Sequence, residues 1–145
     1  MTTVATRNGK KAVGDVASII EEFRTVYADA VVECLTNEAW EEAAQKRTLK
    51  WQSERRIPLQ DAAVCYAAIV DGYNEFQPSM IANLDAVFAD CGIEVTPARE
   101  LSVAVYLHVP DKPGLRKRVE RFVRANFQAD LVSWQDSGTL HVWWD

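Results

Sequence analysis

The spacing of apolar residues changes abruptly along this chain, and the change falls just after Pro97. The stretch "LSVAVYLHV" at 101–109 places an apolar residue at every second position. Successive side chains of a strand point to opposite faces of a sheet, so this pattern predicts a strand with one face on a core. Before Pro97, apolar positions recur at intervals of three and four, which is typical of helices. We therefore expect an α+β fold.

Four helices are expected upstream of that point, in a helical part that spans 15–92. Asp15 and Ser79 are suited to cap the first and the last of them, and Gly92 is suited to end the last in a left-handed conformation. Pro58 separates the second helix from the third, because the residue before a proline disfavours helical backbone. The expected helices cover 15–34, 35–56, 59–73 and 79–91.

The C-terminal part, 100–145, is expected to be a β-α-β-β unit. Helical spacing returns in "LRKRVERFVRANF" at 115–127, and the turn residues "DSG" at 136–138 separate two short apolar stretches. Strands are expected at 101–109, 130–135 and 139–144. Together they would form a small three-stranded mixed sheet. Its first two strands would run parallel, and the last one, antiparallel to them, could lie at an edge.

Length and composition fit one domain. The chain has 145 residues, of which 48% are apolar and 26% charged, so it can bury a core and is not of a disordered type. We expect a flexible basic tail at 1–14 and a single α+β domain at 15–145. The longest apolar run, nine residues at 62–70, is far short of a membrane span. No signal-peptide core follows the first residues, so we expect a cytoplasmic protein with three reduced cysteines.

Charge is unevenly distributed in this acidic chain, whose net charge is −5. Two basic segments, 46–56 and 112–127, are set between acidic ones. The stretch "KPGLRKR" at 112–118 places a glycine and several bases at the start of a helix that follows a strand, where anions can bind. One glycine does not make a phosphate-loop fingerprint, so the sequence favours a turn that leads into a solvated basic helix face.

Trp143 and Trp144 are neighbours in the last expected strand and should point to opposite faces of the sheet. Leu140 and Val142 share a face with Trp144, whereas His141 shares the other with Trp143. If helices cover both faces, both tryptophans belong to the core. A tryptophan that is left outside the core is a candidate anchor for a partner.

The preferred hypothesis is a cytoplasmic, non-enzymatic protein-binding module that forms a homo-oligomer or binds another protein. Such a module would act as an adaptor, regulator or inhibitor by occupying a partner's surface, and the accessory proteins of phages and other mobile elements are one setting for it. The acidic side chains of the expected second helix would contribute a negative surface. The candidate partner-binding residues are Trp134, Trp143, Trp144, Glu38, Glu41 and Glu42.

Two other hypotheses remain open. The first is nucleic-acid binding by the basic helix at 115–127. Its candidate residues are Arg116, Lys117, Arg118, Arg121 and Arg124. The second is an enzyme that uses His108 or His141, for which a ligand-sized apolar pocket beside either histidine would be favourable evidence. The sequence has no motif for a metal site or a cofactor, and we expect neither these nor a membrane partner.

Overall fold

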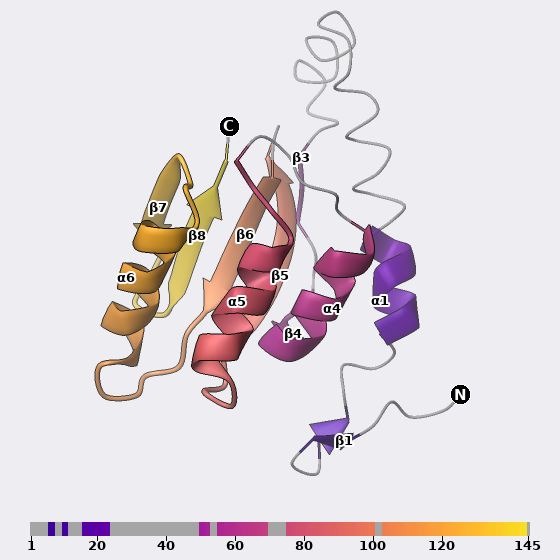
Figure 1. Cartoon of the computed structure of the whole chain (residues 1–145), viewed down its shortest axis with the longest axis horizontal. Helices are drawn as coiled ribbons and strands as arrows, with labels where there is room; N and C mark the ends of the chain where they lie inside the picture. The colour runs from indigo at the N-terminus through magenta and orange to yellow at the C-terminus, as the bar shows by residue number, and fades with distance from the viewer. Residues whose placement is uncertain are drawn as a thin grey trace, which may run out of the picture.

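The computed structural model describes residues 6–7, 10–11, 16–23, 50–52, 55–69, 75–100 and 103–144, and this part of the chain is α+β, as expected (Figure 1). The helices are α1 (Val16–Phe23), α4 (Leu59–Ile69), α5 (Ser79–Phe88) and α6 (Leu115–Asn126). The strands are β1 (Thr6–Arg7), β2 (Lys10–Lys11), β3 (Lys50–Gln52), β4 (Ile57–Pro58), β5 (Glu94–Glu100), β6 (Val103–His108), β7 (Leu131–Trp134) and β8 (Thr139–Trp143). None of these helices has the length and apolar character needed to cross a membrane.

Six of the described strands form one antiparallel sheet. Their order is β3-β5-β6-β8-β7, and the two-residue β4 also pairs with β5. β6 and β7 run in the same direction, as expected, but β8 lies between them and pairs antiparallel with both. The prediction of a three-stranded mixed sheet is therefore wrong, and β8 is an inner strand. Among the described strands, β1 and β2 pair with each other and with no other strand, and they lie within the segment expected to be a tail.

β5 was not expected from the sequence, because Pro97 and three charged residues break any alternation of apolar side chains in 94–100. β4 pairs with this strand as far as Val95, and β3 pairs with it from Ala98 onward. Pro97 lies between these two short pairings, where its missing N–H is not required. β5 is a strand because strands on both sides pair with it, and its own pattern does not show it.

The prediction of four helices in 15–92 is also wrong. Lys50–Gln52 forms β3, although the expected second helix covers 35–56, and it pairs with Ala98–Glu100. Strand pairing between segments far apart in sequence has overridden a local pattern that favoured a helix. Residues 24–49, which make up the rest of that helix and part of the first, lie outside the described residues.

The third and fourth expected helices are confirmed as α4 and α5. The N-cap of α5 is Pro78 and makes no side-chain hydrogen bond, so Ser79 is the first residue of the helix and does not cap it. Gly92 has the left-handed backbone expected of it, with φ of +84°, but it lies four residues beyond the end of α5 at Phe88.

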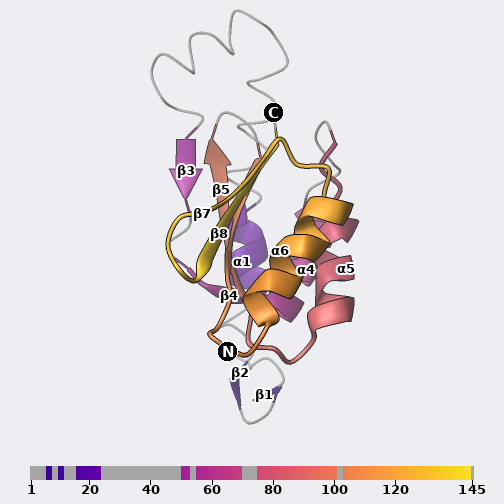
Figure 2. The same cartoon turned by 90° about the vertical axis from the view of Figure 1, so that its left-hand side faces the viewer.

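Helices α4, α5 and α6 pack on one face of the sheet, which we call the inner face; we call the opposite face the outer face (Figure 2). Inner-face side chains of β6 and β8 form a continuous core with these helices. The buried strand residues include Val103, Val105, Leu107, Leu140, Val142 and Trp144, and the buried helix residues include Tyr66, Ile81, Leu84, Val119 and Val123. This is the two-layer arrangement of an antiparallel sheet with helices packed on one face.

A polar network joins α6 to the edge strand β7. Trp134 Nε1 donates to Glu120 Oε1 at 2.7 Å, and Arg124 Nε donates to Glu120 Oε2 at 2.8 Å. These bonds, that of Trp134 first, hold the pKa of Glu120 below its ordinary value. Arg124 Nη2 also donates to the backbone oxygen of Val132 at 2.9 Å, so one acceptor of the edge strand is already bonded.

Candidate functional site

Cross-strand rows of side chains make up the outer face, because directly paired residues of antiparallel strands point to the same side. The first row is Ala104, Trp143 and Leu131, and the second is Tyr106, His141 and Ser133. We call these six residues the neutral rows, since none is Lys, Arg, Asp or Glu. A third row holds Glu94, His108 and Thr139, and it marks the start of a polar region.

The two tryptophans at the end of β8 have different environments. Trp144 is fully buried on the inner face, where its Nε1 donates to the backbone oxygen of Phe127 at 2.8 Å. Its ring also meets that of Phe76 edge to face, with 4.7 Å between centroids. Trp143 is half-buried on the outer face, in the row with Leu131. Trp144 is thus a core residue, and Trp143 is the one that faces away from the helices.

Aromatic side chains dominate the neutral rows. The rings of Tyr106 and His141 stack with 4.7 Å between centroids and 17° between planes. Leu131, at the edge of the first row, keeps 43% of its surface exposed, whereas Ala104 and His141 are buried and contribute little to the surface. Aromatic enrichment and depletion of charge are the features that distinguish the centre of a protein interface from ordinary surface.

The remaining candidates for partner binding lie elsewhere. Trp134 is half-buried and belongs to the inner face, because it pairs with the buried Leu140. Its indole N–H is bonded to Glu120, which gives it a structural role at the edge of the sheet. Glu38, Glu41 and Glu42 lie outside the described residues, so their predicted acidic surface stays a prediction.

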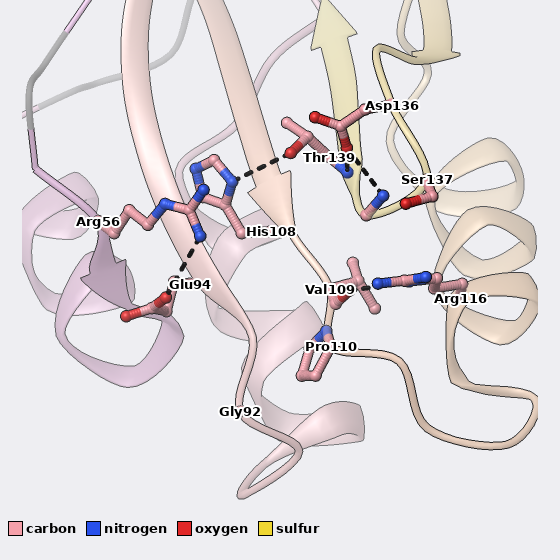
Figure 3. A pocket seen from close by; sticks show the side chains of 11 residues that line it. Arg56, Gly92, Glu94, His108, Val109, Pro110, Arg116, Asp136, Ser137 and Thr139 are labelled. Carbon is pink, nitrogen blue, oxygen red and sulfur yellow. Dashed lines mark hydrogen bonds and ion pairs between the residues drawn. The ribbon is translucent and has the colours of Figure 1, made fainter.

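A pocket of about 470 Å³ opens at the polar end of the outer face (Figure 3). Side chains from five separate segments line it. Arg56 precedes β4, Glu94 and His108 come from β5 and β6, Arg116 comes from the first turn of α6, and Asp136 belongs to the β7–β8 turn. We call it the polar pocket, because most of its lining surface is polar.

His108 is fixed in one tautomer within this pocket. Thr96 Oγ1 donates its proton to the Arg55 carbonyl oxygen at 2.9 Å, so in the 2.7 Å contact with His108 Nε2 the ring nitrogen is the donor. Nδ1 then carries no proton in the neutral ring, and the hydroxyl of Thr139, 3.3 Å away, can donate to it. Burial, reinforced by the Arg56 guanidinium and opposed by Asp136, lowers the pKa of His108 below 6.5.

The acidic groups of the polar pocket have partners within it. The backbone N–H groups of Gly138 and Thr139 both donate to Asp136 Oδ1 at 2.8 Å, and the bond from Gly138 is the main cause of the lowered pKa of Asp136. Glu94 Oε1 lies 4.0 Å from Arg56 Nη1, which is an ion pair without a hydrogen bond.

The two guanidinium groups keep unused donors. Arg116 Nε donates to the Val109 carbonyl oxygen at 3.0 Å, and Arg116 Nη1 is 3.9 Å from Asp111, whose side chain is almost fully exposed. Within the part of the chain that the structure describes, the Nη groups of Arg116 and the guanidinium of Arg56 donate no hydrogen bond. The pocket can therefore offer several N–H donors to a ligand.

Two of the five basic residues of α6 are hydrogen-bonded to backbone oxygens. These are Arg116, whose side chain is 29% exposed, and Arg124, whose side chain is 53% exposed. Lys117, Arg118 and Arg121 are exposed on α6. All five were expected to form one surface, and the structure distinguishes the two that bond backbone oxygens from the other three.

Within the described residues, no group of three or more His, Cys, Asp and Glu side chains is placed to hold a metal ion. His108 and His141 share the outer face but lie in successive rows. The pocket beside His108 is ligand-sized, as the enzyme hypothesis requires, but polar where an apolar one was sought. No family model, curated protein or solved structure matches this chain.

Sequence reasoning missed the polar pocket as a unit. Its charged side chains come from residues 56 to 136, and no local motif joins them. One signal was present, since the basic stretch at 112–118 was noted as a place where anions can bind, and Arg116 belongs to it. The contribution of Arg56 could be found only from the tertiary structure, because it depends on the pairing of β4 with β5.

Proposed function

We propose that this chain is a cytoplasmic, non-enzymatic protein-binding module, and that the neutral rows are the surface on which it pairs with a second copy of itself. The half-buried and exposed members of the rows carry the proposal: Trp143, Tyr106, Ser133 and Leu131 include two aromatic rings and no Lys, Arg, Asp or Glu, whereas Ala104 and His141 are buried. Tryptophan and tyrosine are among the side chains that anchor interfaces, and here they stand near the centre of the face.

The lack of charge in the rows allows a second copy as the occupant. The chain carries a net charge of −5, so two copies repel each other over much of their surface. The neutral rows add no charge of their own to this repulsion. In a two-fold pair the same patch is buried on both copies, and an uncharged patch is complementary to itself. Trp143 and Leu131 of one copy would lie against Trp143 and Tyr106 of the other.

The thiols support a cytoplasmic location. Cys65 is buried, and burial raises its pKa to about 11, so it stays a protonated, unreactive thiol. Cys91 is free as well, and Cys34 lies outside the described residues. Small secreted domains usually pair their cysteines as disulfides, whereas cytosolic proteins keep them reduced.

Light scattering coupled to size-exclusion chromatography tests the proposal. We expect the native chain to be a dimer and the Trp143→Ser and Leu131→Ser variants to be monomers. Circular dichroism should show that both variants are folded. Val87→Ser is the matched control, because Val87 on α5 is 58% exposed but belongs to the helix layer, and this variant should stay dimeric. A monomeric native chain, or a dimer that persists in both outer-face variants, would overturn the proposal.

Nucleic-acid binding is a second candidate function, because Lys117, Arg118 and Arg121 form one exposed basic surface on α6. Phosphate contacts of this kind give an affinity that falls steeply with salt. Titration of the chain with single- and double-stranded DNA and RNA should then show binding at low salt that Arg118→Gln and Arg121→Gln both weaken. Flat titrations at low salt would rule this function out.

A further inference from the structure

We propose that the polar pocket binds the phosphate group of a small phosphorylated ligand, which lies between the guanidinium groups of Arg56 and Arg116. This site is separate from the pairing surface of the neutral rows and does not depend on it. The volume of about 470 Å³ is within the range of about 300–1,000 Å³ typical of small-molecule sites, so there is room for more than the phosphate itself.

The positions of the two arginines favour a tetrahedral anion. Arg56 and Arg116 reach the pocket from opposite sides, with His108 and the β7–β8 turn between them (Figure 3). A carboxylate presents its two oxygens in one plane and suits a single guanidinium fork. A phosphate presents oxygens in several directions, so it can accept from both walls together, and the Ser137 hydroxyl lies on the same lining.

The carboxylates of the pocket do not occupy the arginine donors. Asp136 is turned toward the Gly138 and Thr139 amides, and Glu94 is 4.0 Å from Arg56, too far for a hydrogen bond. The nearest acid to Arg116 is Asp111, at 3.9 Å, and its side chain is 91% exposed. Ion pairs at such distances and exposures contribute little, so a phosphate that forms direct bonds can compete with them.

Gly138 places Arg116 in the pocket. A Cβ atom on this residue would lie 2.8 Å from Arg116 Nη2 and 3.3 Å from the Val109 carbonyl oxygen. Arg116 thus lies across the turn in space that a side chain at residue 138 would partly take. Since the closest atom is the end of a flexible side chain, Gly138→Ala should move Arg116 while the fold is kept.

His108 supplies an independent readout of a bound phosphate. The groups that face its ring are Thr96 and Glu94 from β5, Arg56, and Thr139 and Asp136 from the β7–β8 hairpin. An added anion favours the charged imidazolium, so phosphate at this site should raise the pKa of His108. An anion held by the exposed bases of α6 lies outside this group and should leave it unchanged.

The test is a nuclear magnetic resonance titration of the full chain with inorganic phosphate and ribose 5-phosphate, and with succinate at matched ionic strength. Both phosphates should give saturable shifts at the Gly138 and Thr139 amides and raise the pKa of His108. Arg56→Gln and Arg116→Gln should each weaken binding about tenfold, as expected for charged hydrogen bonds. Arg118→Gln removes the same charge from α6 outside the pocket and is the matched control. Gly138→Ala keeps every charge and should also weaken binding.

Three results would overturn the proposal. The first is a titration without saturable shifts at the pocket. The second is an equal loss of affinity in Arg116→Gln and Arg118→Gln, which would assign the binding to the exposed basic surface of α6. The third is succinate binding as tightly as phosphate, which would show that the pocket does not prefer a tetrahedral anion to a carboxylate. Ribose 5-phosphate that binds more tightly than inorganic phosphate would show that the rest of the pocket holds the organic part of the ligand.

Discussion

Trp143 and Trp144 are adjacent in sequence, yet they belong to the two faces of the sheet and have different roles. Trp144 has its indole N–H bonded to Phe127 and its ring enclosed by aromatic neighbours. Trp143 is half-buried beside Leu131 in a row without charge. Identical side chains are placed on the inner or the outer face by strand parity alone, because a shift of one residue would exchange their faces.

Replacing each tryptophan by alanine should give the largest difference in the free energy of unfolding between the two faces. Trp144→Ala removes a fully buried ring and should lower the free energy of unfolding by about 3–5 kcal/mol. Trp143→Ala should lower it by only about 1 kcal/mol, since that ring is only half-buried. Urea unfolding followed by circular dichroism measures both. Equal losses would show that the outer face is packed as firmly as the core.

The polar network at β7 allows a second test on the inner face, which concerns the hydrogen bond between Trp134 and Glu120. Trp134→Phe keeps an aromatic ring but removes the hydrogen bond to Glu120, and it should cost about 1.5–3 kcal/mol at neutral pH. Because folding lowers the pKa of Glu120, this contribution is present above pH 4.5 and is lost as the pH falls through the folded-state value. A double-mutant cycle with Glu120→Gln isolates the pair. Additive effects in that cycle would contradict the assigned bond.

The smallest expected effect is a change in pH dependence at the third row of the outer face. The folded pKa of His108 lies below 6.5, so the unfolded chain binds a proton first as the pH falls. The contribution of His108 to the free energy of unfolding should therefore be constant above pH 6.5. As the pH falls from 6.5 to the folded-state pKa, the free energy of unfolding should decrease. His108→Gln should flatten this part of the curve in chemical unfolding measured across pH. An unchanged slope would show that another group is responsible.

The alternation of apolar residues predicted the sides of the sheet correctly. It placed Leu140, Val142 and Trp144 on one face and Trp143 on the other, and the structure shows the first three buried together. Parity is a local property, which the sequence carries residue by residue. The order of the strands is not local: β8 was expected after β7, and nothing in either segment indicates that β8 would pair with β6.

The parts that could not be predicted depend on contacts between distant segments. β3 has the sequence "KWQ", which has no alternating pattern, and β5 contains Pro97. Each is a strand because a neighbour supplies the pairing. For the same reason the candidate sites were predicted only in pieces, with Trp143 and Arg116 named from the sequence but neither the neutral rows nor the polar pocket foreseen.

The bond from Arg124 to the Val132 carbonyl affects how copies of this protein can assemble. An unbonded edge strand invites further strands from other molecules, and such addition can repeat without end into fibres. At β7 this template is interrupted, because one of its acceptors is already held by α6. Pairing through the outer faces, as proposed above, would be complete after two molecules. A single arginine thus removes one acceptor from the template that this edge of the sheet would offer to a strand of another molecule.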